Sequence, residues 1–133
     1  MHKAKSILVI AGLLGALSVM LGAFAAHGLK AQLNTEMIEV FKTGVLYQFI
    51  HVFGLIACAV LSLLSRQSEV KKRFYRAAIC FIIGIFCFSG SLYLLAITGI
   101  KWFGPITPLG GLMFIVGWVL FAFAAKSIDE VSA

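Results

Sequence analysis

Four segments of the chain, residues 6–26, 44–64, 77–98 and 106–125, contain no Asp, Glu, Lys or Arg. Each is about 20 residues long, which is the length that an α-helix needs to cross the hydrocarbon core of a bilayer. Because no water is available there, each peptide N–H and C=O group must be hydrogen-bonded within the protein, and this favours helices over open strands. The sequence therefore predicts an all-α, polytopic membrane protein with four transmembrane helices.

The composition favours a single membrane domain. Of the 133 residues, 62% are hydrophobic, far above the level of soluble proteins. Four spans and short loops leave too few residues for a separate soluble domain, so residues 1–133 are expected to form one four-helix domain. The net charge of +6 then indicates contact with a membrane surface, and we expect no nucleic-acid partner.

Basic residues are concentrated on one side of the expected bundle. An even number of spans puts the N-terminal tail, the second loop and the C-terminus on the same side, which then holds eight of the 11 Lys and Arg residues. By the positive-inside rule, both termini are expected in the cytoplasm. We also expect the second loop to lie near anionic lipid head groups. Its five cations are Arg66, Lys71, Lys72, Arg73 and Arg76.

The N-terminal segment shares features with a cleavable signal peptide, because Lys3 and Lys5 precede an apolar run that ends near Ala23-Phe24-Ala25. The run is longer than the usual hydrophobic region of a signal peptide, so we expect it to be retained as the first span.

The first outer loop carries a helical pattern of its own, with apolar residues at every third or fourth position between 33 and 41. A short amphipathic surface helix, capped by Asn34 or Thr35, is expected there. If it continued to residue 64 it would be about 45 Å long, against a hydrocarbon core of about 30 Å. A bend near Thr43-Gly44 would resolve this excess.

Polar residues of the spans gather in the outer half of the membrane or at its centre. The expected cluster contains His27, Tyr47, Gln48, His51, Ser89, Ser91, Tyr93 and Thr107. The cytoplasmic half of the spans is nearly all apolar, whereas a channel needs polar lining along its whole length. The pattern therefore predicts a polar pocket, or a hydrogen-bonded knot, that is closed on the inside.

Two interpretations of this cluster remain open. An ionisable residue inside a membrane is a candidate functional residue, but a neutral His bonded to Gln, Ser, Tyr or a carbonyl can simply fasten helices. A proton carrier would need a partner charge, and the spans contain no carboxylate. The same absence argues against a small multidrug transporter. Two histidines alone, His27 and His51, are weak evidence for a haem site.

The remaining chemistry-bearing residues do not form a recognisable catalytic set. No nucleophile and base occur at a readable spacing, and no third metal ligand accompanies the histidines. Cys58, Cys80 and Cys87 lie inside spans without metal-site spacing and are expected to pack as small apolar residues. We therefore expect a protein that is not an enzyme, with no catalytic residues, no metal and no cofactor.

Five blocks of sequence carry a family resemblance. They are GAFAAHGL at 22–29, FKTGVLYQFIH at 41–51, FSGSLY at 88–93, GPITPLGG at 104–111 and the pair Gly117-Trp118. Together they resemble the bacterial domain of unknown function 423 family, small inner-membrane proteins related to eukaryotic transmembrane protein 256. Ala25 and Gly44 stand where the family pattern has Gly and Ala, which are equally small.

The resemblance implies a four-helix, multi-pass protein of the bacterial inner (plasma) membrane, but it supplies no reaction. The leading hypothesis is a non-enzymatic module whose polar cluster packs helices or binds a small polar ligand. The alternatives are a small-solute or ion transporter that acts as a homo-oligomer, and an accessory subunit that binds a partner within a larger membrane complex.

Overall fold

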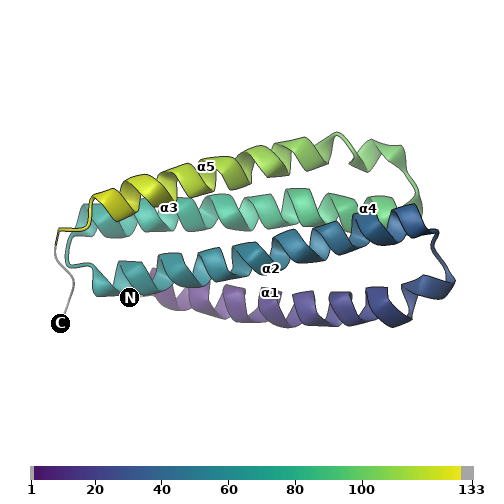
Figure 1. Ribbon diagram of the computed structural model, residues 1–133. Helices are drawn as coiled ribbons and strands as arrows, with labels where there is room; N and C mark the ends of the chain where they lie inside the picture. Colours follow the sequence, from purple (N-terminus) through teal and green to yellow (C-terminus); the bar gives the residue numbers. More distant parts are fainter. Residues whose placement is uncertain (1, 130–133) are drawn as a thin grey trace.

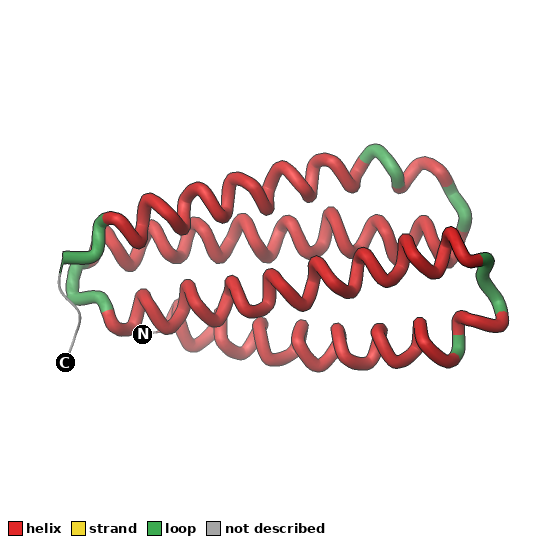
Figure 2. Tube along the Cα trace, in the orientation of Figure 1, coloured by secondary structure: helices red, strands yellow, loops and turns green. Residues whose placement is uncertain are grey.

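The computed structural model describes residues 2–129 and shows four long helical crossings side by side (Figure 1). The elements are α1 (His2–His27), η1 (Leu29–Ala31), α2 (Thr35–Leu64), α3 (Ser68–Gly84), η2 (Ile85–Ser89), α4 (Gly90–Thr98), η3 (Lys101–Phe103) and α5 (Ile106–Lys126). The third crossing is one continuous helical path of α3, η2 and α4 (Figure 2). All four crossings are long and apolar enough to span a membrane, as the sequence predicts.

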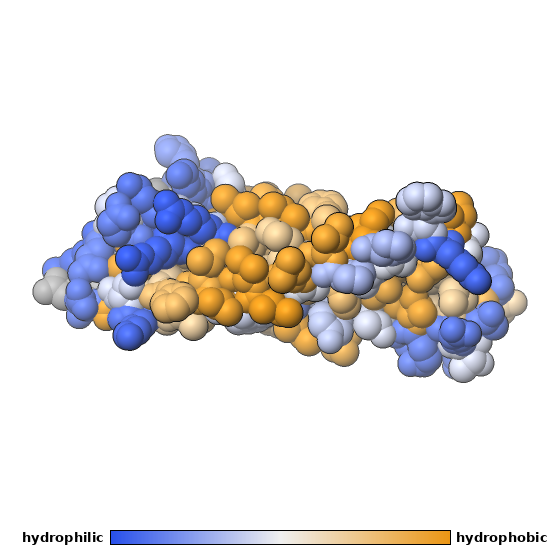
Figure 3. All heavy atoms as spheres, turned by 90° about the horizontal axis from the view of Figure 1, so that it is seen from above, coloured by the Kyte–Doolittle hydropathy of each residue, from blue (hydrophilic) through white to orange (hydrophobic). Residues whose placement is uncertain are grey.

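The four crossings are not equivalent in their packing. α1 packs mainly on α2, and α5 packs mainly on α3 and η2, so α1 and α5 lie at opposite edges of the molecule (Figure 1). The start of α1 and the end of α5 lie at the same end, in agreement with an even number of crossings. An apolar band separates two polar ends (Figure 3). The arrangement fits a bilayer crossed along the helix axes.

The expected amphipathic surface helix is helical, but it is not a separate element. Residues 35–64 form a single α-helix of 30 residues, and Asn34 caps it by accepting a 2.8 Å hydrogen bond from the Met37 N–H. The prediction of a separate helix in the outer loop is therefore wrong. Phe41 is fully buried and packs with Ala25, Leu29 and Ala96. This small apolar cluster holds the first turns of α2 against α1 and α4.

A π-helical turn, η2, interrupts the third crossing between Gly84 and Gly90. Each extra residue in a turn rotates the following side chains by about 100° relative to an unbroken α-helix. Buried residues lie on both sides of this turn: Gly84 precedes it, and Ser89, Ser91 and Leu92 lie at its end or just beyond it.

Close helix contacts depend on glycines at the interface between α5 and the third crossing, among them Gly84 and Gly110. A Cβ atom on Gly110 would collide with the backbone nitrogen of Phe88 in η2, and one on Gly84 would collide with the ring of Phe114. Gly110 lets α5 approach the backbone of the π-helical turn, and Gly84 leaves room for the Phe114 ring, the kind of contact that small residues permit between membrane helices. The approach places α5 beside the polar residues of η2 and α4.

Candidate functional site

His51 lies inside the protein and uses both of its ring nitrogens. Its side chain is only 3% exposed. The indole Nε1–H of Trp118 donates a 3.0 Å hydrogen bond to His51 Nε2, and His51 Nδ1 lies 2.6 Å from the backbone oxygen of Tyr47. Because an indole N–H can only donate and a carbonyl can only accept, the imidazole must carry its proton on Nδ1. His51 is therefore a neutral histidine with both nitrogens occupied.

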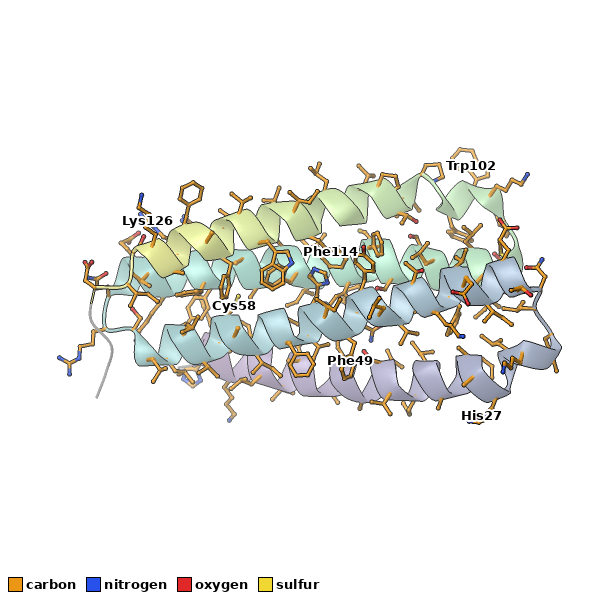
Figure 4. The ribbon with its side chains drawn as sticks, in the orientation of Figure 1. His27, Phe49, Cys58, Trp102, Phe114 and Lys126 are labelled. Atoms are coloured by element: carbon orange, nitrogen blue, oxygen red, sulfur yellow. The ribbon has the colours of Figure 1, made fainter. Side chains whose placement is uncertain are left out.

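Aromatic rings enclose this imidazole. Phe114 of α5 stacks on His51 with ring centroids 3.5 Å apart and an angle of 9° between the planes, and Figure 4 shows Phe114 turned toward the interior of the protein. The rings of Phe81 and Trp118 lie 5.5 Å and 5.7 Å from that of His51. The histidine is thus held between α3 and α5 by flat apolar surfaces.

Gln48, one turn before His51, is also paired at both ends of its amide. Its Nε2 donates to the backbone oxygen of Leu14 in α1 at 2.9 Å. Its Oε1 accepts a 2.6 Å hydrogen bond from the hydroxyl of Tyr93 in α4. The amide is 1% exposed, and it joins α1, α2 and α4 in a single chain of hydrogen bonds.

Hydroxyl groups make two further joints. Ser89 of η2 donates to the backbone oxygen of Gly44 at 2.7 Å. Ser91 donates to the Phe88 carbonyl at 2.8 Å, and its oxygen lies 2.6 Å from that of Thr107. Since a serine has a single O–H, Thr107 is the donor in this second contact. These bonds connect α2 to η2 and α4 to α5.

The position of Thr107 follows from where the last helix begins. α5 starts at Ile106 after Pro105, so Thr107 lies in the first turn and its hydroxyl faces Ser91. Gly44, in turn, leaves room for the third crossing, because a Cβ atom there would lie 2.7 Å from the Tyr93 ring. Thr107 thus bonds to Ser91, and Gly44 allows Tyr93 to lie close to α2.

The structure brings most of the expected cluster together and corrects it at two positions. His27 ends α1 as an exposed residue and points away from the other helices (Figure 4), so it belongs to neither the cluster nor a pair with His51. Tyr47 is 38% exposed. It contributes its backbone oxygen to His51 and its ring to a 4.5 Å contact with Phe88.

Trp118 and Phe114 contact His51, and the sequence reasoning missed both. Trp118 carried a usable signal: an indole N–H in the middle of an apolar span must find an acceptor, because the lipid offers none. Phe114 gave no such signal, since one ring among the twelve phenylalanines of the chain does not reveal its partner. The backbone acceptors of Leu14, Gly44 and Tyr47 are equally invisible in the sequence.

The bacterial family described as protein of unknown function (DUF423) matches residues 21–111 of the chain. The chain belongs to this family. All eight residues of the expected cluster fall within the DUF423 match, whereas Trp118 lies beyond it.

Relatives of this DUF423 protein come from distant bacteria. It is 41% identical to the UPF0382 membrane protein YwdK of Bacillus subtilis over 122 residues, which cover 91% of this chain and 96% of YwdK. It is 37% identical to a UPF0382 membrane protein of Haemophilus influenzae, covering 89% and 91% of the two chains. It is 32% identical to the UPF0382 inner membrane protein YgdD of Escherichia coli, covering 92% and 90%. No solved structure gives a significant match.

These matches confirm the resemblance noted in the sequence. They also agree with the four apolar helices in making this DUF423 protein a multi-pass membrane protein.

Proposed function

We propose that this DUF423 protein is a non-enzymatic structural module of the bacterial inner membrane, and that its polar cluster joins helices and binds no solute. The observation that carries the proposal is the pairing of Gln48 and His51, whose side-chain nitrogens and oxygen are all hydrogen-bonded within the bundle. Each ring nitrogen of a neutral imidazole makes one hydrogen bond, so His51 must break a bond before it can bind a ligand, and the Gln48 side chain is only 1% exposed.

Most of the interhelical hydrogen bonds of the cluster involve α2. Gln48 reaches α1 and α4, the backbone of Gly44 reaches η2, and His51 reaches α5 through Trp118. Interhelical hydrogen bonds in membranes contribute about 0.6 kcal/mol on average and up to about 1.7 kcal/mol each. Because α2 forms such bonds with each of the three other crossings, it is the central helix that holds the bundle together.

We further propose that the protein acts through its outer faces, as an accessory subunit for other membrane components. α1 and α5 each bury a narrow face and present large apolar side chains outward, among them Leu13, Leu109 and Ile115, each more than 60% exposed. Apolar faces of this kind suit contact with lipid chains or with a neighbouring membrane helix.

The proposal is tested with the purified protein in sealed liposomes and in detergent. We expect no uptake of protons, potassium or small polar solutes above that of protein-free liposomes, and we expect His51→Leu to lower the thermal midpoint of unfolding. Tyr47→Phe is the matched control, because the Tyr47 ring is part of the same region while its half-exposed side chain contributes packing. Uptake that is lost in a folded His51→Leu variant would overturn the proposal in favour of a transporter.

A further inference from the structure

A groove lies between α1 and α3 at the end of the molecule that holds the start of α1. The groove has a volume of about 390 Å³, and its apolar part is lined by Ile7 and Ile10 of α1 and by Ile79 and Ile82 of α3. A second hollow of about 210 Å³ adjoins it and shares Lys3, Tyr75 and Ile79 with it. Neither hollow includes residues of the polar cluster, so this feature is separate from the site described above.

The lining of the groove changes from cationic to apolar along the helix axes. Lys3, Lys72 and Arg76 surround the mouth, whereas Ile10 and Ile82 line the deeper part. From Lys3 to Ile10 the groove descends about 10 Å along α1. This descent matches the change from the head-group layer to the hydrocarbon of a bilayer.

The mouth keeps a positive charge after its internal contacts are counted. Among residues 2–129, Glu69 pairs with Lys72 at 3.0 Å and interacts electrostatically with Arg76. This single carboxylate is outnumbered by the three cations of the mouth, Lys3, Lys72 and Arg76, so a net positive charge faces an incoming anion. The Lys3 ammonium lies 5.5 Å from the centre of the Tyr75 ring, so the ring helps to hold this cation over the groove. Tyr75 itself lies at the boundary between the two hollows, at the level where tyrosines are enriched in membrane proteins.

We propose that this groove binds one anionic phospholipid of the cytoplasmic leaflet. The phosphate contacts Lys3 and Arg76, the Tyr75 hydroxyl donates to a phosphate or ester oxygen, and the upper part of one acyl chain lies on Ile7, Ile10 and Ile79. A soluble phosphate would use the cations and leave the isoleucines uncovered. A neighbouring transmembrane helix is about 30 Å long, and the groove is too short to seat it.

Native mass spectrometry of the full protein, released from nanodiscs of defined composition, tests this proposal. We expect one phosphatidylglycerol to be retained per protein in preference to phosphatidylethanolamine. The double variant Lys3→Gln and Arg76→Gln should weaken this preference by about fivefold for each cation removed. The matched control, Lys71→Gln with Lys126→Gln, removes the same charge from the same end at positions that do not line the groove, and it should retain the lipid.

A second pair of variants tests the apolar part without changing charge. Ile79 and Ile83 are 54% and 41% exposed on α3, and of the two Ile79 lines the groove. Ile79→Trp should fill the groove and release the lipid, whereas Ile83→Trp should not. Equal retention in both tryptophan variants, equal loss in both charge variants, or displacement of the lipid by millimolar glycerol phosphate would each overturn the proposal. The experiment does not depend on the polar cluster, so its failure would leave the proposed helix-joining role intact.

Discussion

The Trp118 indole donates its N–H to Nε2 of His51 across the contact between α5 and α2, at a distance of 3.0 Å. The bond explains why two residues with polar groups are tolerated deep in an apolar bundle: each satisfies the other. It also determines the tautomer, since an imidazole nitrogen that accepts from an indole cannot carry a proton. α1 and α5 lie at opposite edges of the molecule, and this bond ties one of these edges to the central helix.

A double-mutant cycle measures this bond. Trp118→Phe should lower the free energy of unfolding in detergent, because it leaves the His51 Nε2 without its donor. His51→Phe should do the same by leaving the indole N–H unpaired. The double variant removes both partners, so its cost should fall short of the sum of the single costs by about 1 kcal/mol. Strict additivity would contradict a direct bond. Trp102→Phe is the control, because Trp102 is 83% exposed at the outer end and points outward (Figure 4).

The tautomer of His51 can be observed directly. In protein with ¹⁵N-labelled histidine, solid-state NMR in lipid bilayers should show a protonated Nδ1 and an unprotonated Nε2 for His51. The physical reason is that the Tyr47 carbonyl needs a donor and the Trp118 indole needs an acceptor. His27, which is exposed at the end of α1, provides the comparison within the same spectrum. A protonated Nε2 at His51 would show that the indole bond is absent.

Two tyrosines near the same polar region should respond differently to loss of their hydroxyls. Tyr93→Phe removes the 2.6 Å bond to Gln48 and leaves a buried amide oxygen unpaired, so it should lower the free energy of unfolding by about 1 kcal/mol. Tyr47→Phe keeps the ring contact with Phe88 and should change it by less than about 0.5 kcal/mol. Thermal unfolding of both variants in the same detergent checks this. A Tyr47→Phe variant as unstable as Tyr93→Phe would contradict the assigned network.

The features that the sequence predicted well are those that depend on the solvent. The bilayer requires about 20 uncharged residues for each crossing, so the four spans can be recognised from the type of each residue alone. Gly99 is another readable signal: it ends α4 with φ +70°, a conformation that favours glycine. The sequence also predicted that Gln48 would lie in the same region as Ser89, Ser91 and Tyr93, because residues at similar depth in adjacent helices lie close together.

The features that the sequence reasoning missed depend on which helix faces which. His27 has a suitable depth, but it lies on a face of α1 that turns away from the bundle. The π-helical turn at Ile85–Ser89 shifts the register of the third crossing, and no periodicity assumed to be α-helical can anticipate that shift. The first turns of α2 are amphipathic whether they lie on the membrane or stand against α1. Their burial around Phe41 is a property of the packed state.

The orientation of the protein in the membrane has a direct test. Eight of the 11 Lys and Arg residues lie at the end that holds both termini, so we expect this end in the cytoplasm. Green fluorescent protein fused after residue 133 should be fluorescent, and alkaline phosphatase fused after residue 101 should be active. The cations between residues 66 and 76 lie on the first turns of α3 and, for Arg66, just before it, and not in a loop as the sequence predicted. Replacing these cations with glutamine should produce mixed orientations, whereas replacing Lys30 and Lys42 should not. An active phosphatase at the C-terminus would contradict the expected orientation.

The closest helix approach predicts a contrast between two glycines. Gly110→Ala should be strongly destabilising, because the new Cβ would collide with the backbone of Phe88, which cannot move aside as a side chain can. Overpacking of this kind typically costs about 1–3 kcal/mol. Gly90 has an ordinary helical φ of −58° and open space where a Cβ would stand. Gly90→Ala should therefore be neutral, or stabilising by up to about 1 kcal/mol. The thermal midpoints of unfolding of Gly110→Ala and Gly90→Ala test this contrast. Equal midpoints would mean that α5 does not approach η2 as closely as the structure shows.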